Sequence, residues 1–403
     1  MLFTQGKTEI APKEAGYNGR RLEVLNGHFQ KLIDKGDVQC AAYCLSRGGK
    51  VFAHGAIGKK SFREDDSTPA SPNCLQWIAS ITKTFTAVAI MKLVEDGLTR
   101  LDSKVGEILP QFDTPPYNQI NLLHLLTHTS GMHADGGCFE NKYQVGYWGL
   151  IEAAYKLRDK EKEFDWIAAA LAAIGSGVRM KPGIEWAYCS FGYVVLGAVI
   201  EKLTGVHSHD YIIDNIAKPL GIDVFWPADT TPDRARRFLF TESSKAWLRD
   251  IIDGKTEEEP DVWDALKIPG TGGSLSGTVN DLVIFGNMML HGGTFNGARI
   301  LGRKAVERMT TLQTHNNPNY CWGAKEEPNR GYGVGFDMRD DMMNGPAYIF
   351  SKGTYMHEGS GACALYVDPK EELVAAWFVP FAKEGWVAPA MYNTVNIIWS
   401  GLL

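Results

Sequence analysis

Residues 77–97 read WIASITKTFTAVAIMKLVEDG. Apolar residues recur at helical intervals from Ser80 to about Glu95, and Asp96-Gly97 is typical of a helix end. Ser80 and Lys83 stand three residues apart at the predicted start of this helix. Residues at this spacing share one helix face, one turn apart. The stretch therefore predicts a helix whose first turn brings an amine within reach of a hydroxyl.

On both sides of this helix, towards the two ends of the chain, the sequence predicts strands. Residues 19–34 carry apolar side chains every three or four positions, which indicates an amphipathic helix, and Gly48-Gly49 suits the tight turn of a hairpin. The terminal segment 388–402 is also predicted to be helical. Five segments are predicted as strands from their extended apolar patterns. These are Ala41–Arg47, Lys50–Ile57, Ala347–Ser351, Cys363–Val367 and Leu373–Val379, with Asp368-Pro369-Lys370 as the turn between the last two.

Strands at both ends and helices between them predict one sheet that is split in the sequence. The expected fold class is α/β (α+β): an antiparallel β-sheet flanked by N- and C-terminal helices, with an inserted, mostly helical lobe. We expect residues 1–75 and 271–403 to form the sheet lobe and residues 76–270 the helical lobe. We expect the two lobes together to make one domain of about residues 20–400.

Composition excludes several classes of protein. The 403 residues are 44% hydrophobic, 11% aromatic and 22% charged, which is typical of a globular chain and not of a disordered one. The 41 Lys and Arg against 47 Asp and Glu give a net charge of −6 without a basic block, so no nucleic-acid partner is expected. The expected partner is a small molecule.

Targeting and cysteine patterns lead to further expectations. Neither a secretory signal nor an apolar run of about 18 residues is visible, which predicts a cytoplasmic protein without a membrane partner. The seven cysteines are scattered and lack a CxxC pair, so reduced thiols are expected.

His124 and His128 have a zinc-like spacing without a third ligand, and neither a P-loop nor a G-x-G-x-x-G fingerprint occurs. No metal or cofactor is expected.

Three short motifs carry possible chemistry. A lysine can activate a serine hydroxyl if burial and nearby positive charge lower the lysine pKa, so Ser80 and Lys83 form a candidate nucleophile and base. Tyr188, in Tyr188-Cys189-Ser190, could relay the serine proton if its hydroxyl were not simply packed and bonded. His357-Glu358-Gly359-Ser360-Gly361 contains glycines that allow close approach to a ligand, or that make a plain bend.

In this order, Ser-x-x-Lys, Tyr-x-Ser and His-x-Gly resemble the serine hydrolases of the class C β-lactamase superfamily, from about residue 20 to the end of the chain. That superfamily includes β-lactamases, D-alanyl-D-alanine carboxypeptidases, D-aminopeptidases, esterases and the lovastatin-type acyltransferase. Five supporting blocks also resemble it: Leu122–Met132, Gly192–Gly205, Lys218–Gly221, Gly272–Ser276 and Tyr332–Phe336.

The resemblance implies roles for individual residues. It assigns Ser80 as the acylated nucleophile, with Lys83 and Tyr188 as base and proton relay in an order that stays open. It also implies an oxyanion hole formed by the backbone N–H groups of Ser80 and Ser360. Ser190 takes the place of an Asn that contacts the lysine or the substrate, and His357, Glu358 and Gly359 are the candidates of the third motif for contact with the substrate.

The third motif departs from the Lys-Thr-Gly of β-lactamases, because His357-Glu358-Gly359 stands in its place. If Glu358 faced the substrate it would repel a negative one, although strand alternation would send His357 and Glu358 to opposite faces. We therefore expect a carboxylesterase for small esters. The alternatives are a D-amino acid amidase or aminopeptidase, a β-lactamase, a D-Ala-D-Ala carboxypeptidase or an acyltransferase, and, in another class, a non-catalytic ligand-binding scaffold.

Overall fold

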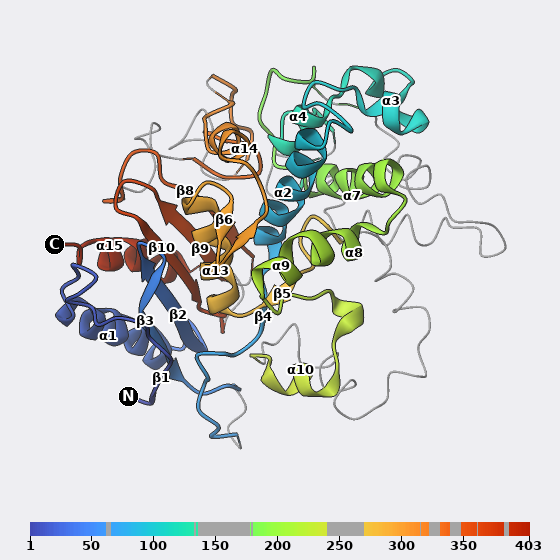
Figure 1. Cartoon of the computed structure of the whole chain (residues 1–403). Helices are drawn as coiled ribbons and strands as arrows, with labels where there is room; N and C mark the ends of the chain where they lie inside the picture. The colour runs from blue at the N-terminus through green and yellow to red at the C-terminus, as the bar shows by residue number, and fades with distance from the viewer. Residues whose placement is uncertain are drawn as a thin grey trace.

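One six-stranded sheet unites the two ends of the chain, as the blue and red strands of Figure 1 show. The computed structural model describes residues 1–61, 66–132, 134–135, 178, 180–239, 270–314, 316–321, 331–338, 348–360, 362–382 and 387–403. The strand order is β1-β3-β2-β10-β9-β8, and every neighbouring pair is antiparallel. The strands are β1 (Phe3–Gln5), β2 (Cys40–Arg47), β3 (Lys50–Gly58), β8 (Tyr355–Gly359), β9 (Cys363–Asp368) and β10 (Leu373–Phe378). The predicted fold class is confirmed.

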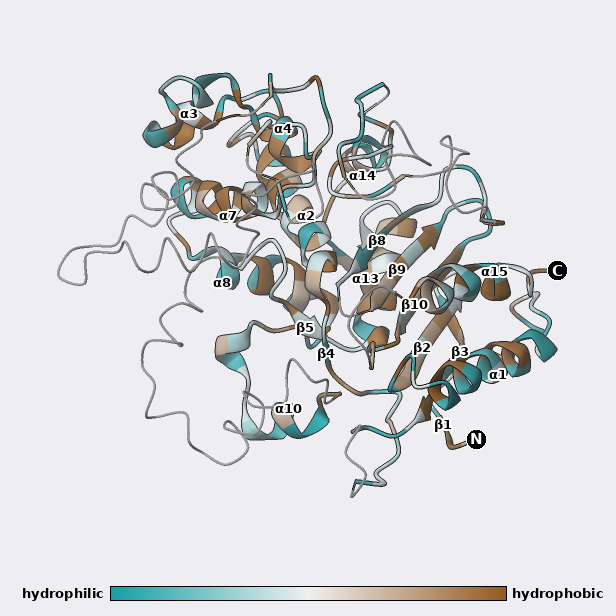
Figure 2. Cartoon of the chain, turned by 180° about the vertical axis from the view of Figure 1, so that it is seen from behind, coloured by the Kyte–Doolittle hydropathy of each residue, from teal (hydrophilic) through white to brown (hydrophobic). Residues whose placement is uncertain are grey.

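Helices cover both faces of this sheet. Helix α1 (Arg20–Asp34) packs with α15 (Thr394–Trp399) and against β2 and β3, whereas α13 (Val279–Leu290) packs against β2, β9 and β10. Figure 2 shows α1 in both teal and brown, as expected for a helix with one apolar face. The predicted helices at both ends of the chain are confirmed, and a π-helical turn, Pro389–Asn393, leads into α15.

Alternation along the strands explains why they read as nearly continuous apolar runs. In β10, Leu373, Ala375 and Trp377 join the core beneath α1 and α15, while the residues between them join the core beneath α13. Both sets are fully buried. A strand that is buried on both faces carries apolar residues at successive positions, so polar and apolar residues do not alternate along it.

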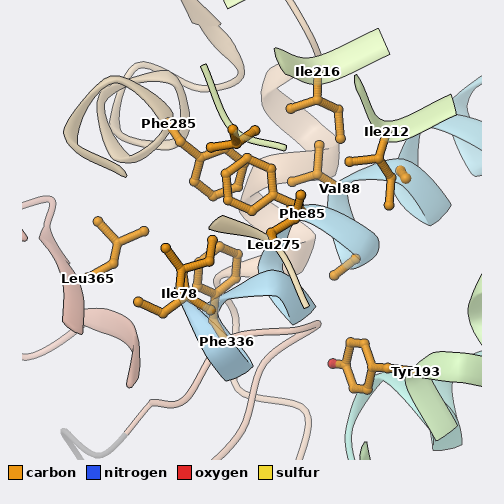
Figure 3. Packing of buried hydrophobic residues seen from close by; sticks show 14 of the residues in the cluster. Ile78, Phe85, Val88, Tyr193, Ile212, Ile216, Leu275, Phe285, Phe336 and Leu365 are labelled. Carbon is orange, nitrogen blue, oxygen red and sulfur yellow. The ribbon is translucent and has the colours of Figure 1, made fainter. Parts of the chain in front are cut away.

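The described residues in the middle of the chain are mainly helical. Helix α2 (Thr82–Glu95) packs against α7 (Ser190–Thr204) and α8 (Ser208–Ile212). Figure 3 shows Phe85 of α2 stacked on Phe285 of α13, with ring centroids 4.0 Å apart. The division into lobes at residues 76 and 270 stays a prediction. The other helices are α3 (Val105–Ile108), α4 (Leu122–Leu126), α9 (Lys218–Leu220), α10 (Pro232–Arg237) and α14 (Arg303–Met309). The remaining short strands are β4 (Gln76–Trp77), β5 (Ser276–Gly277), β6 (Thr294–Phe295) and β7 (Ala298–Arg299).

Both predicted turns form for local reasons. Gly48 and Gly49 have φ angles of 55° and 82°, which glycine adopts without a steric cost, and they join β2 to β3. The Asp368 carboxylate accepts hydrogen bonds from the backbone N–H groups of Lys370 and Glu371, which fixes the turn between β9 and β10.

The predicted strand at Ala347–Ser351 is wrong, because residues 348–351 do not pair in the sheet. Its aromatic residues pack through their rings instead: Tyr348 stacks on Phe350 at 4.8 Å, and Phe350 meets Tyr366 and Trp399. The edge position next to β9 is taken by β8. Side-chain packing and not backbone pairing therefore accounts for the apolar pattern.

The expectation of reduced thiols is also wrong for one residue. Cys321 is disulfide-bonded, to a partner outside the described residues. Cys40, Cys44, Cys74, Cys189 and Cys363 are free, as expected.

The sequence also predicts that the acidic stretch 253–264 is a solvated loop, and that the aromatic-rich section 132–164 either caps the substrate cleft or packs the helical lobe. The first stretch and most of the second lie outside the described residues. In the part of the chain that is described, no helix is long and apolar enough to cross a membrane.

Candidate active site

Ser80 lies in a short 3₁₀ turn, Ala79–Ile81, directly before α2. Lys83 is fully buried in the first turn of α2, and its ammonium nitrogen donates a hydrogen bond to Ser80 Oγ at 3.1 Å. Ala79 precedes Ser80 with φ of 44°, in the left-handed region that costs a non-glycine residue energy. The sequence thus predicted the contact between Ser80 and Lys83, but not the strained backbone conformation of Ala79 that precedes it.

Burial sets the protonation of Lys83. The pKa of Lys83 is lowered from 10.5 to about 8, chiefly because the ammonium is removed from water, while the negative charge of Asp135 acts in the opposite direction. Lys83 Nζ also donates to the carbonyl of Gly272 at 2.5 Å, which fixes the amine on the side of Ser80. A lysine in this range can be partly neutral near physiological pH and can then accept a proton.

Tyr188 completes the group around the serine. Its hydroxyl is hydrogen-bonded to Ser80, and Lys83 Nζ lies 4.8 Å from the centre of its ring. The pKa of Tyr188 is raised well above 10, first by burial, with Asp135 and Asp337 adding to the effect. Tyr188 is therefore a neutral phenol that can pass a proton on, whereas Lys83 is the better first acceptor.

The third motif approaches Ser80 through a glycine. Gly359 is the last residue of β8, and a Cβ at this position would lie 2.6 Å from the Ile78 carbonyl and 3.1 Å from the Ala79 Cβ. Only a glycine lets β8 come this close to the turn that carries Ser80. Ser360 follows directly and is exposed.

His357 is held by both ring nitrogens. Nδ1 lies 2.8 Å from the Glu358 carbonyl, which can only accept, so Nδ1 carries the proton. In the neutral ring Nε2 then accepts from the Tyr332 hydroxyl at 3.1 Å. The side chain is buried and its ring centre lies 6.4 Å from that of Tyr188. His357 thus lies beside the Ser80 group as part of a bonded aromatic cluster.

Glu358 points to the other face of the sheet. Its carboxylate accepts a hydrogen bond of 2.6 Å from the Tyr366 hydroxyl, and Tyr366 belongs to the core beneath α1 and α15. The sequence interpretation that Glu358 contacts the substrate, and repels negative ones, therefore does not fit this structure. Strand alternation in β8 is the reason, because His357 and Gly359 take the side of Ser80.

Ser190 begins α7 and is bonded to Asp135, a residue that the sequence analysis missed. The Ser190 hydroxyl donates to Asp135 Oδ2 at 2.6 Å, and the Ser190 backbone N–H donates to Oδ1 at 2.8 Å. The Asp135 backbone N–H in turn donates to the Tyr188 carbonyl at 2.8 Å. A single aspartate outside the three motifs forms no pattern of its own, so no sequence signal pointed to it.

Other residues of the site come from blocks that the resemblance had marked without a role. Gly272 supplies the carbonyl for Lys83, and Tyr332 bonds His357. His128 accepts from the Cys189 N–H through Nδ1 and stacks on Tyr188 at 4.1 Å. Three of the five supporting blocks thus contact residues of the three motifs.

The zinc-like spacing of His124 and His128 is not realised as two ligands on one helix. His124 caps α4 with Asn121, whereas His128 lies beyond the helix with φ of 58°. Within the described ranges, no group of three or more His, Cys, Asp or Glu residues could hold a metal ion.

Comparison with known proteins gives a match along most of the chain. A family model described as beta-lactamase matches residues 25–390. A protein of Escherichia coli (strain K12), provisionally named a D-alanyl-D-alanine carboxypeptidase, is 23% identical over 441 residues. The alignment covers 96% of this chain and 94% of that protein.

Two solved structures share the fold. A family VIII carboxylesterase superposes with a TM-score of 0.71 and 17% identity, over 98% of this chain and all of that one. EstCE1, described as a hydrolase with promiscuous acyltransferase activity, superposes with a TM-score of 0.72 and 18% identity, over 94% of this chain and 98% of that one. At 17–18% sequence identity, these two similarities show a shared fold and no more.

Proposed function

The chain belongs to the beta-lactamase family of serine hydrolases, and from this premise we propose that it is a carboxylesterase that cleaves small esters through an acyl-enzyme on Ser80. The observation that carries the proposal is the hydrogen bond of 3.1 Å from the fully buried Lys83 to Ser80 Oγ. It supplies a nucleophile and a base in contact.

The proposed reaction has two half-reactions. Neutral Lys83 takes the Ser80 proton while Oγ attacks the ester carbonyl, and the backbone N–H groups of Ser80 and Ser360 stabilise the oxyanion. The alcohol leaves with a proton passed through Tyr188, and the acyl group stays on Ser80. Water then attacks the acyl-enzyme, so that one ester and one water give one acid and one alcohol.

The third motif supports an ester over a substrate that carries a carboxylate. A carboxylate is bound best by a cationic partner, and His357 is held as a donor to one carbonyl and an acceptor from Tyr332. The fold shared with a family VIII carboxylesterase agrees with this choice. A D-alanyl-D-alanine carboxypeptidase is the second candidate, supported by the similarity to the provisionally named Escherichia coli protein.

The cellular location of the protein stays a prediction from the sequence, which favours the cytoplasm. The disulfide bond of Cys321 is an argument against the cytoplasm, because disulfides persist mainly in oxidising compartments.

The test is intact-protein mass spectrometry with peptide mapping after incubation with a fluorophosphonate, p-nitrophenyl butyrate or a β-lactam. We expect a stable fluorophosphonate adduct and a transient butyryl adduct, both on Ser80, and none with the lactam. Ser80→Ala should abolish both adducts and turnover, while Ser400→Ala, an exposed serine beyond α15, should change neither. A lasting lactam adduct would favour the carboxypeptidase, and no adduct at all would favour the non-catalytic scaffold.

A further inference from the structure

The backbone on either side of Tyr188 is hydrogen-bonded to one residue, His128. The Ala187 N–H donates to the His128 carbonyl at 3.0 Å, and the Cys189 N–H donates to His128 Nδ1 at 3.0 Å. Cys189 and His128 are 61 positions apart in the sequence. The segment that carries Tyr188 is therefore held at two points by a distant part of the chain, once before the tyrosine and once after it.

The imidazole of His128 also packs on the phenol ring. The ring centroids of His128 and Tyr188 lie 4.1 Å apart, and the ring planes differ by 28°. Trp186 and Tyr332 meet the same imidazole edge-on, at centroid distances of 5.8 Å and 5.0 Å. Both His128 and Tyr188 are buried. Because close packing restricts a buried ring to few rotamers, His128 orients the Tyr188 side chain as well as its backbone.

The backbone conformation of His128 makes histidine a costly choice at this position. Its φ of 58° lies in the left-handed region, where the backbone by itself favours glycine or asparagine. Asparagine would supply an acceptor without a ring, and glycine would supply neither. Histidine is the aromatic side chain with a nitrogen that can accept a hydrogen bond. The residue in this strained position thus has both features that the contacts with the Tyr188 segment use.

We infer that His128 is the positioning residue of Tyr188 and holds the phenol where it protonates the leaving alcohol. This inference rests on the proposed esterase function. In the acylation step the C–O bond of the ester breaks, the departing oxygen takes the phenol proton, and Tyr188 takes the proton that Lys83 received from Ser80. A positioned general acid contributes about 10²–10⁴-fold to the rate. Displacement of the donor should remove a large part of that factor.

The experiment compares two esters that have the same acyl group. Ethyl butyrate releases a strongly basic alkoxide, which must be protonated as it leaves. By contrast, p-nitrophenyl butyrate releases a stabilised phenolate, which needs no proton. The value of kcat/KM for each ester reports formation of the same butyryl-enzyme. Loss of a positioned acid should therefore slow the ethyl ester selectively, whereas loss of folded protein or of the nucleophile slows both esters.

Two substitutions of His128 each keep one of its contacts. His128→Asn keeps an acceptor for the Cys189 N–H and suits the φ of 58°, but lacks the ring, whereas His128→Phe keeps a ring and lacks the acceptor. We expect each to lower kcat/KM about tenfold or more for ethyl butyrate and less than about threefold for p-nitrophenyl butyrate. Thermal unfolding identifies the folded variants, and His128→Asn by itself suffices for the comparison.

The matched control is His124→Asn, which removes a histidine that caps α4 in the same block of sequence. It should leave the ratio of the two kcat/KM values unchanged. Tyr188→Phe should show the selective loss in full. Adding His128→Asn to Tyr188→Phe should cost ethyl butyrate less than about threefold more, because a positioning residue has no effect once the group that it positions is gone.

The outcomes separate this inference from the proposed function. Equal losses for the two esters in the folded His128 variants would overturn the inference, and so would a full additional loss in the Tyr188→Phe background. If Tyr188→Phe showed no selective loss, or if the unaltered protein cleaved only p-nitrophenyl butyrate, the alcohol would not take its proton from Tyr188. The inference would then fail while the esterase stands. No turnover of either ester by the unaltered protein would overturn the proposed function itself.

Discussion

Replacing Lys83 by methionine should stabilise the folded protein relative to wild type at neutral pH, or leave it nearly unchanged, while it abolishes catalysis. The side chain is fully buried, and methionine has a similar length and no charge. A buried ammonium opposes folding because the unfolded chain would hydrate it. The site therefore carries a cost in stability that the proposed chemistry needs.

The pKa of Lys83 gives the size of this cost. A fall from 10.5 to about 8 corresponds to about 3 kcal/mol at about 1.4 kcal/mol per pH unit. Since the folded pKa is the lower one, this penalty is complete below pH 8 and disappears as the pH rises towards 10.5. Methionine also leaves the Gly272 carbonyl without its amine donor, which costs about 1–3 kcal/mol at every pH.

Urea unfolding of both proteins from pH 7 to pH 10 measures the difference. We expect the stability of Lys83→Met relative to wild type to fall by about 2–3 kcal/mol across this range, from zero or slightly positive at pH 7 to negative at pH 10. Lys92→Met on the same helix, where the side chain is not fully buried, corrects for the loss of a lysine as such. A difference that stays constant with pH would refute the reasoning, since Lys83 would then be equally protonated in both states.

Three further outcomes are expected. For a neutral ester, kcat/KM should rise with pH through about 8, as Lys83 loses its proton, and a flat profile from pH 6 to pH 9 would contradict Lys83 as the base. Gly359→Ala should cost about 1–3 kcal/mol in thermal unfolding and also lower kcat, because its Cβ would lie 2.4 Å from Cys363 Sγ and 2.6 Å from the Ile78 carbonyl. An unchanged kcat would show that the close packing of Gly359 against the turn before Ser80 does not affect catalysis. Asp368→Ala should destabilise by about 2–4 kcal/mol in urea, because the buried carboxylate accepts from Trp399 Nε1 and from three backbone N–H groups. A loss below about 0.5 kcal/mol would show that water replaces those bonds.

Contacts that lie close in the sequence were predicted from it. Ser80 and Lys83 meet because residues three apart on a helix share a face, and Gly48-Gly49 and Asp368 form turns through local backbone preferences. The antiparallel sheet also followed, because strands with apolar patterns at both ends of the chain can bury those residues only against one another.

The order of the three motifs and their resemblance to a family led to Tyr188 and His357 as candidates, but not to their hydrogen-bond partners. The Tyr332 hydroxyl meets His357 only through the fold, and so does the Gly272 carbonyl that fixes Lys83. These bonds join segments far apart in the chain, and no local pattern encodes them.

The tertiary structure alone decided two further points. Glu358 turns away from Ser80 because strand β8, which the sequence did not predict, sets its face. Asp135 reaches the site because its loop is bonded to the start of α7 at Ser190. Both side chains are carboxylates, and what each one does depends on which other segments surround it. The sequence by itself therefore determined the contact between Ser80 and Lys83, the helix that follows Ser80 and the sheet, because local geometry and burial specify them. The electrostatic character of the site was decided by long-range packing.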